Sequence, residues 1–338
     1  MVRHSPARVT QQAIAERLEV SQALVSLVMS GRAGKRVPQD TQDRILATAS
    51  ELGYVPDRSA QMLRLRRTRT IACVVPDITN PFYPALERGV QEAALEAGYD
   101  VIAINTDGLH ARERQLIVWA RQGRVDGIIG VFFALTDQEL EEMASAGVAV
   151  VSLGSRAPES DRHAVDHIYT DNAGAAVTAT EYLIARGHVR ILAITSRGGP
   201  GPDREAGYRR AMQEAGLPVW IEHADDFTAN AGQATMRRLL AGDVPTAVFA
   251  ANDLIAAGVI LALHEAGLRI PEQVAVVGFD DIDLARLLYP ALTTIRLFQR
   301  ETGLVAARRV VARLDTHDPS DTGFQLKRPF ELVIRQSA

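Results

Sequence analysis

From about residue 70 onward, short apolar runs alternate with longer amphipathic stretches, and this alternation constrains the fold more than any other feature of the chain. The apolar runs have the length of buried strands; they lie at residues 71–75, 100–104, 127–131, 148–153, 190–195, 247–250 and 274–278. The amphipathic stretches have helical periodicity, and several end in glycine; they lie at residues 83–98, 112–123, 173–187, 205–216, 231–242 and 254–267. This rhythm predicts an α/β fold of doubly wound parallel sheets with helices on both faces.

The length of this region predicts two subdomains. About 270 residues exceed what one hydrophobic core comfortably holds, so we expect two sheets. The long stretch at residues 155–167 is a plausible first crossing between them, and a second crossing near residues 294–299 would return the last long helix to the first subdomain. The predicted N-subdomain covers about residues 70–166 and 298–325, and the predicted C-subdomain about 167–297 and 326–338.

The first seventy residues show helical patterns and no strand pattern. Thr10 is a good N-cap for a helix at residues 11–18, and Ser21 is a good N-cap for a second helix at residues 22–29. A tight turn separates the two. A third helix should follow Pro38. Its expected apolar stripe is Ile45, Leu46, Ala49 and Leu52, with Gly53 just after its end.

The net charge of −4 at pH 7 hides an asymmetry between these two regions. Residues 1–69 carry 12 Arg and Lys against 6 Asp and Glu, whereas the remaining 269 residues carry 25 basic and 35 acidic side chains. A basic head on an acidic body is typical of a nucleic-acid-binding module joined to another function. Residues 57–69 hold five arginines, which predicts a linker that becomes ordered only when an anion is present.

Several classes of protein are excluded by what the sequence lacks. Cys73 is the single cysteine, which rules out a disulfide framework and a cysteine-based zinc site. The N-terminus has no apolar signal region, and no apolar run approaches the roughly 20 residues needed to cross a membrane, so we expect a cytoplasmic protein without membrane association. The glycine-rich segment at residues 198–202 lacks the Gly-Lys-Ser/Thr of a phosphate loop. Without a catalytic motif, we expect neither enzyme activity, nor a cofactor, nor a bound metal.

The two short helices and the turn between them have the spacing of a helix-turn-helix unit. On the second helix, Val25 and Val28 should face inward. The exposed face would then carry short or uncharged side chains that permit close approach to a DNA major groove. These side chains are Gln22, Ala23, Ser26 and Leu27.

On these and further motifs the chain resembles the lactose-repressor (LacI/GalR) family of transcriptional regulators. The resemblance rests on VTQQAIA at 9–15, VSQALVS at 20–26, ELGYVPDRSA at 51–60, VPDITNPFY at 75–83, AND at 251–253, VVGFDD at 276–281 and LTTI at 292–295. It spans nearly the whole chain in the family's order. It implies a helix-turn-helix DNA-binding head at residues 1–56, a hinge helix and linker at 57–69, and an effector-binding and dimerisation core at 70–338 with a periplasmic-binding-protein-like architecture.

The resemblance assigns roles in binding double-stranded DNA. The positions that match base-reading residues are Gln22, Ala23 and Leu27, and those that match phosphate contacts are Thr10, Ser21 and Ser26. Glutamine can pair with adenine through two hydrogen bonds, while Ala23 and Leu27 can meet only a thymine methyl group. Leu63 matches the leucine that wedges into a central base step, and Ala60 beside it is small enough for the two hinge helices to approach.

A second candidate site lies beyond the carboxyl ends of the predicted strands, where open α/β folds bind ligands. Its expected residues are Asn80, Phe82, Asp107, Asn252 and Asp280, together with Arg204 and Phe227, which match effector-contacting positions of the family. Aromatic faces with amide, carboxylate and guanidinium groups suit a polyhydroxylated effector such as a sugar. The alternative for each Asn and Asp is that it merely caps the following helix.

These observations predict a transcriptional regulator, most simply a repressor, that binds a pseudo-palindromic operator as a homodimer and responds to a small molecule. By resemblance, residues 83–98 and 112–123 form the dimer contact. The main rival is a solute-binding receptor of a transporter, which has the same two-lobed core but should start near residue 70 after a signal peptide, without a basic head. An enzyme on a doubly wound fold is the other rival, and it requires a catalytic constellation that the sequence does not contain.

Overall fold

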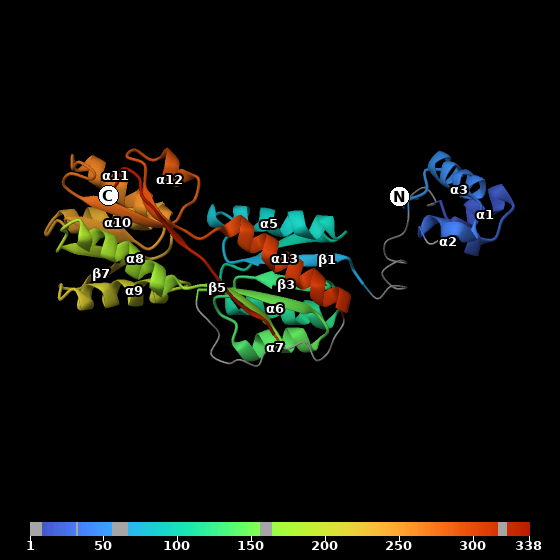
Figure 1. Cartoon of the computed structure of the whole chain (residues 1–338), viewed down its shortest axis with the longest axis horizontal. Coiled ribbons are helices and arrows are strands. Elements are labelled where there is room, and N and C mark those ends of the chain that lie inside the picture. Colours follow the sequence, from blue (N-terminus) through green and yellow to red (C-terminus); the bar gives the residue numbers. More distant parts are fainter. Residues whose placement is uncertain (1–8, 32, 56–66, 156–163, 317–322) are drawn as a thin grey trace, which may run out of the picture. The chain divides into compact units, whose positions relative to one another are not determined.

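The computed structural model describes residues 9–31, 33–55, 67–155, 164–316 and 323–338. The chain divides into two compact units, residues 1–67 and residues 68–338 (Figure 1), and each is described here by itself. Most of the expected hinge, including Ala60 and Leu63, lies outside the described residues.

The first unit is a small helical head whose first two helices have the bounds that the sequence pattern predicts. Its elements are α1 Gln11–Leu18, α2 Gln22–Met29, the 3-10 helix η1 Gly34–Arg36 and α3 Gln39–Glu51. The hydroxyl of Thr10 accepts a hydrogen bond from the N–H of Ala13, and that of Ser21 accepts one from Leu24, each at 3.2 Å. Both predicted N-caps therefore satisfy a backbone donor that the helix itself leaves unpaired.

A single apolar cluster holds the three helices together, with Ile14, Val25 and Ile45 fully buried at its centre. One prediction for α3 is wrong: Leu46 is 48% exposed, and Thr48 is buried in its place. The reason is geometric, because positions 45, 48, 49 and 52 share one face of a helix and position 46 is rotated away from it. At the end of α3, the N–H groups of Gly53 and Tyr54 bond back to the carbonyls of Ser50 and Ala49, which closes the helix as predicted.

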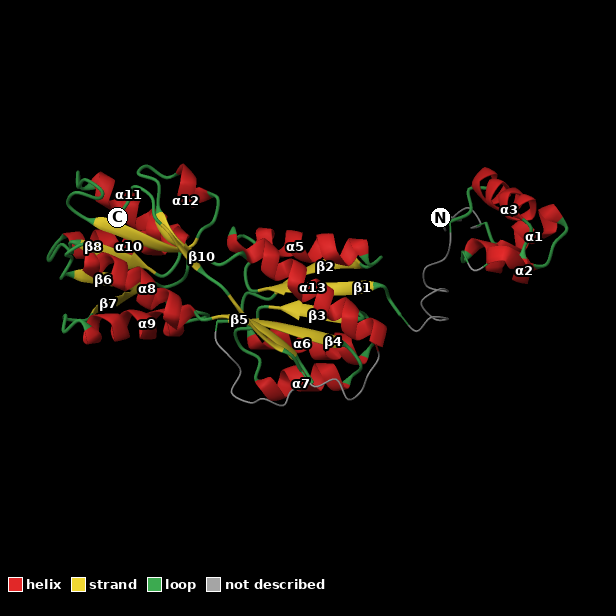
Figure 2. Cartoon of the chain, viewed as in Figure 1, coloured by secondary structure: helices red, strands yellow, loops and turns green. Residues whose placement is uncertain are grey.

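The second unit contains two six-stranded sheets, as the length of the region predicts (Figure 2). The first sheet has the order β11-β5-β4-β3-β1-β2 and is parallel throughout. The second has the order β12-β10-β9-β8-β6-β7 and is parallel except at β12. The strands are β1 Thr70–Val75, β2 Asp100–Asn105, β3 Gly127–Gly130, β4 Ala149–Gly154, β5 Asp166–Thr170, β6 Ile191–Thr195, β7 Trp220–His223, β8 Ala247–Ala250, β9 Ala275–Asp280, β10 Thr293–Arg296, β11 Gln325–Arg328 and β12 Glu331–Val333.

Helices cover both faces of each sheet. On the first sheet, one core cluster lies under α5 and α13 and another lies under α6 and α7. On the second sheet, α8 and α9 cover one face, and α10 and α11 cover the other. The helices are α5 Phe82–Glu96, α6 His110–Arg121, α7 Asp137–Ser145, α8 Asn172–Ala185, α9 Gly201–Glu214, α10 Ala229–Leu240, α11 Asp253–Glu265, α12 Leu284–Leu287 and α13 Gln299–Thr316.

The first crossing between the sheets comes later than the sequence pattern suggested. Strand β5 pairs with β4 and β11, so the chain stays in the first sheet through Thr170 and does not cross within residues 155–167. It also passes between the sheets after Arg296, where α13 returns to the first sheet as expected, and after Arg328. The pattern missed five strands, namely β5, β7, β10, β11 and β12. Of these, β7 and β11 carry charged and polar residues at sheet edges, which breaks the apolar run.

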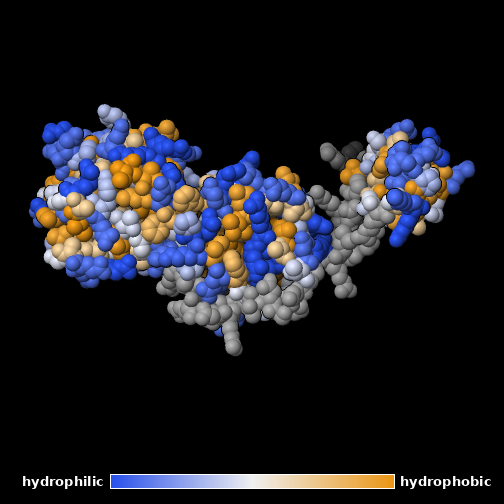
Figure 3. All heavy atoms as spheres, in the orientation of Figure 1, coloured by the Kyte–Doolittle hydropathy of each residue, from blue (hydrophilic) through white to orange (hydrophobic). Residues whose placement is uncertain are grey.

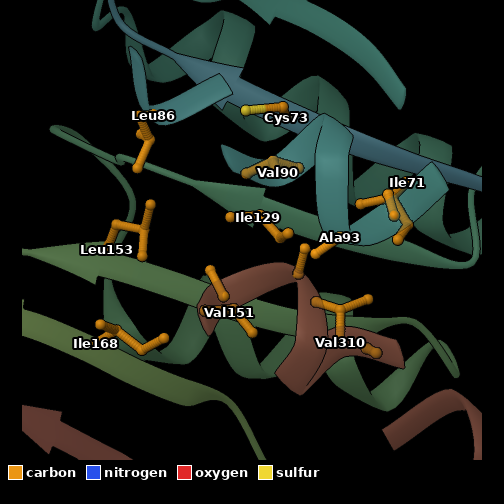
Figure 4. Packing of buried hydrophobic residues seen from close by; sticks show 14 of the residues in the cluster. Ile71, Cys73, Leu86, Val90, Ala93, Ile129, Val151, Leu153, Ile168 and Val310 are labelled. Carbon is orange, nitrogen blue, oxygen red and sulfur yellow. The ribbon is translucent and has the colours of Figure 1, made fainter. Parts of the chain in front are cut away.

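The return of α13 completes the first subdomain through close helix packing (Figure 4). Val310 of α13 lies in the same buried cluster as Val90 of α5 and Ile129 of β3. The two helices approach closely where both lack a side chain. A Cβ on Gly89 would lie 2.0 Å from the carbonyl oxygen of Arg300, and one on Gly303 would lie 2.1 Å from that of Leu86.

We therefore expect Gly89→Ala to destabilise the core by about 1–3 kcal/mol, because the new methyl group forces α5 and α13 apart. Alanine is the better helix former, so a loss of stability must come from packing. The control is Gly242→Ala, where the nearest atom is 3.9 Å away and no strained φ is present. The unfolding midpoint in denaturant measures both; equal midpoints for the two variants would contradict the prediction.

Candidate functional site

Among the described DNA-binding candidates of the head, Thr10 and Ser21 cap α1 and α2, and the others lie along α2. Gln22 and Ala23 are exposed, whereas Leu27 is half-buried and packs against the apolar cluster of the head. Val25 and Val28 face inward, as predicted. The second helix thus presents its N-terminal side chains outward, and this is the end that helix-turn-helix proteins place in the major groove.

The capping role of Thr10 and Ser21 is compatible with phosphate contact. Each hydroxyl oxygen accepts a bond from a backbone N–H, which leaves its own O–H free to donate. The described part of the head exposes four basic side chains, on α1, η1 and α3. They are Arg17, Lys35, Arg36 and Arg44.

The second candidate site centres on the guanidinium of Arg204, in α9, which is 4% exposed. Its Nη2 lies 3.2 Å from a carboxylate oxygen of Asp280, and its Nε donates to the amide oxygen of Asn172 at 2.7 Å. The group also lies 3.8 Å above the centre of the Phe279 ring and donates to the carbonyl of Ala251. Burial lowers the pKa of Arg204 and the charge of Asp280 opposes this, so the guanidinium remains ionised.

Asp280 ends strand β9 with a strained backbone. Its φ is +112° and that of Asp281 is +54°, values that residues other than glycine rarely adopt. The turn is held by Asp253, whose carboxylate accepts bonds from the N–H of Ile282 and the hydroxyl of Thr294. Asp281 adds two ion pairs, to Arg296 and Arg335. The surrounding structure therefore fixes where the Asp280 carboxylate points.

The protonation equilibrium of this carboxyl group is also shifted. Burial raises the pKa of Asp280 to about 6, and Arg204 opposes that shift by favouring the ionised form. Burial, together with the nearby charge of Asp280, raises the pKa of Asp253 well above its usual value. Strong shifts from burial and a specific charged partner are typical of functional sites.

The first subdomain reaches this centre through the start of α5. Phe82 packs against the cores of both subdomains, and its ring meets that of Tyr83 edge-on at 5.1 Å. Burial and the charge of Asp280 raise the pKa of Tyr83. Asn80 accepts a bond from the N–H of Phe82 and so shapes this turn. Gln299, at the start of α13, donates to the carbonyl oxygen of Asp280.

Asn252 and Phe227 lie side by side, and the Asn252 amide is occupied by the fold. Its oxygen caps α11 by accepting from Ile255, and its nitrogen donates to the carbonyl of Phe227. The capping alternative thus describes what Asn252 does in this structure.

Asp107 lies apart on the surface, where its carboxylate pairs with Arg112 and accepts a hydrogen bond from Asn105. Among the contacts of the described residues, none joins Asp107 to Arg204 or Asp280.

Three residues of the centre are absent from the sequence-based set: Tyr83, Asn172 and Gln299. Asn172 follows strand β5, which the sequence pattern did not reveal, so its position beyond a strand end was hidden. Gln299 lies at a predicted crossing, where no strand end or helix periodicity marks a side chain as part of a site.

The described residues contain no group of three or more His, Cys, Asp or Glu that could hold a metal ion.

Comparison with known proteins gives the same architecture along the whole chain. A model of the periplasmic binding protein-like domain matches residues 180–338. The ribose operon repressor of Escherichia coli is 35% identical over 310 residues, which cover 90% of this chain and 93% of that protein. The transcriptional repressor PurR of Photobacterium profundum is 32% identical, covering 89% and 90%, and catabolite control protein A of Priestia megaterium is 32% identical, covering 97% and 99%.

Solved structures agree. A lac repressor dimer bound to operator and the anti-inducer ONPF superposes with a TM-score of 0.85 at 25% identity, covering 98% of this chain and 99% of that one. The transcriptional regulator CelR in complex with cellobiose gives a TM-score of 0.70 at 32% identity, covering 98% and 100%.

A helix-turn-helix head joined to a two-lobed, periplasmic-binding-protein-like core defines a class of transcriptional regulators. The chain belongs to the LacI family of this class. Of these three relatives, two are named as repressors and none is named as an enzyme. No helix in the described part of the chain is long and apolar enough to cross a membrane.

The raised pKa of Asp280 predicts a pH-dependent stability. The folded chain holds this proton more tightly than the unfolded chain, whose pKa is near 3.8, so ionisation destabilises the fold. The contribution of Asp280 to the free energy of unfolding should fall by up to about 3 kcal/mol as the pH rises from about 4 to about 6. Asp280→Asn removes this titration. Denaturant unfolding across this pH range measures the free energy of unfolding of the parent and of Asp280→Asn. If the difference between the two free energies does not change with pH, the raised pKa of Asp280 is refuted.

Proposed function

We propose that this regulator is a repressor whose affinity for its operator is set by a small molecule bound between the two core subdomains. The observation that carries the proposal is the buried Arg204–Asp280 pair, which both subdomains surround. An ion pair this deeply buried contributes little net stability, because removing both charges from water costs as much as their attraction returns. Its retention beside a subdomain boundary supports a role in binding.

In the head, we assign base contacts to Gln22, Ala23 and Leu27. Phosphate contacts are assigned to Thr10, Ser21 and Ser26. Leu63 would wedge into the central base step, with Ala60 allowing the hinge helices of two subunits to approach. The exposure of Gln22 and Ala23 and the free hydroxyl protons of Thr10 and Ser21 support these roles.

For the effector, we propose a polyhydroxylated molecule such as a sugar, held by Asp280, Arg204, Phe82 and Phe227, with Asn80, Asn252 and Asp107 as further members of the site. The charge of Arg204 is already compensated by Asp280, so the pair favours a neutral ligand whose hydroxyl groups both donate and accept. A family member from Enterococcus faecium has been solved with bound ribose, and CelR with cellobiose, which supports a sugar.

We further propose a homodimer on a pseudo-palindromic operator, because one short head reads too few bases for specificity. Helices α5 and α6 and the edge strand β2 would form the contact. Each exposes a large apolar side chain, namely Leu95, Val118 and Ile102. Figure 3 shows hydrophobic residues among hydrophilic ones on the visible face of the effector-binding core.

Effector and operator would be linked through the closure of the two subdomains. If the effector binds one degree of closure better than another, it shifts the population toward that state, and the spacing of the two hinges changes with it. A coupling of roughly 1–3 kcal/mol would change operator affinity by about 5- to 150-fold.

Deleting residues 1–67 should abolish specific and salt-dependent DNA binding while the core remains folded. The basic side chains that attract phosphate lie in the head, and the core is a separate compact unit with a net negative charge. Fluorescence anisotropy with operator DNA at several salt concentrations measures the binding, and circular dichroism checks the fold. Operator binding by the truncated chain would overturn the proposal.

Asp280→Ala should abolish the effector response and leave operator binding of the effector-free protein largely intact. Thermal-shift screening of ribose, cellobiose and purine bases against the parent protein first identifies a ligand. The matched control is Asp283→Ala, three residues along, whose exposed carboxylate pairs only with exposed Arg286 among the described contacts. An unchanged ligand shift in Asp280→Ala would remove this residue from the site.

A further inference from the structure

One side chain connects the two subdomains without belonging to the site described above. Phe133 follows β3 in the first subdomain, and the residue is 39% exposed. A Cβ placed on Gly199, in the second subdomain, would lie 2.6 Å from the tip of this ring. A Cβ on Gly108, after β2, would lie 3.1 Å from the edge of the ring. The ring is therefore packed directly against the backbone at Gly108 and at Gly199.

The backbone beside Phe133 is held firmly. The carboxylate of Glu113, in α6, is fully buried and accepts three hydrogen bonds at 3.0 Å, from the N–H groups of Phe133, Ala134 and Leu135. Charge-assisted bonds of this kind are about twice as strong as neutral ones. Phe133 thus projects from a fixed point of the first subdomain.

The segment that Phe133 meets is the one that leads to Arg204. Gly199 has a φ of +51° and lies two residues before the start of α9. Gly201 begins that helix so close to the preceding turn that a Cβ there would lie 1.8 Å from the carbonyl oxygen of Ser196. Ser155, of the first subdomain, donates to the carboxylate of Asp203 in the same turn. Both cross-boundary contacts therefore end on the first turn of α9 or just before it.

We propose that Phe133 is a positioning residue, which acts as a strut that fixes the approach of the two subdomains by packing against the turn before Arg204. An aromatic ring supplies a large apolar contact surface. Since glycine offers no side chain, a small tilt of one subdomain either parts the ring from Gly199 or drives the two into collision. The role in effector response rests on the proposed function, but the effect on subdomain approach does not.

The test measures the separation of the subdomains directly, in the full chain. Spin labels are attached through Gln138→Cys in α7 and Arg210→Cys in α9, both exposed positions. Cys73 does not interfere, because it is buried and burial raises the pKa of its thiol to about 12. Pulsed electron paramagnetic resonance then gives the distance distribution between the two labels.

Phe133→Ala should broaden this distribution and extend it to shorter distances, because no ring then limits the approach to Gly199, and Phe133→Leu, which keeps part of the apolar contact, should change it less. The matched control is Phe324→Ala, because Phe324 has the same 39% exposure but stacks with Arg309 within the first subdomain. A parent-like distribution in Phe133→Ala, or an equal shift in Phe324→Ala, would overturn the proposal. Labelled chain is diluted with an excess of unlabelled chain, so that distances between subunits of the proposed dimer do not contribute. Because neither DNA nor effector is needed, the outcome is then independent of whether the proposed function holds.

Discussion

A buried positive charge is the constraint on which the arrangement around Arg204 depends. A guanidinium taken out of water must be compensated by charge and by hydrogen bonds, and here the compensation comes from segments far apart in the chain. Asp280 lies at the end of β9, Asn172 at the start of α8 and Ala251 after β8. Each partner occupies the carboxyl end of a strand or the residues just after one, so the charge is satisfied only when the sheets have formed in this order.

The strained turn at Asp280 follows from the same requirement. A relaxed backbone at positions 280 and 281 would point the carboxylate elsewhere, so Asp253 and the two arginines bound to Asp281 hold the turn in place. Asp253 is a fully buried acid that bonds only to neutral donors among the described contacts. Burying a carboxylate without a charged partner costs free energy. The positive φ angles and the buried acid thus occur together at this turn, as expected of a functional site.

The sequence predicted those helices and strands that are marked by a pattern among neighbouring residues. The N-caps Thr10 and Ser21, the buried strands and the glycine-terminated helices all show periodicity or capping chemistry within a few residues. The polar edge strands β7 and β11 and the crossing after Thr170 depend on pairing with distant segments, and no local pattern encodes that. Only part of the candidate site could be predicted in the same way. The family motifs indicate Arg204 and Asp280. Asn172 and Gln299, in contrast, contact these residues only because the tertiary fold brings them together.

The close pairing of α5 with α13 has a consequence for how the protein is made. The two helices are separated by about 200 residues, and the second subdomain is synthesised between them. While that subdomain emerges from the ribosome, the apolar face of α5 and one face of the first sheet lack their cover. The head can fold early, but the first subdomain must wait for α13, the last helix of the described chain, and for β11 after it. During synthesis the N-terminal half of the core therefore exposes apolar surface, which makes a chain prone to aggregation until it is covered.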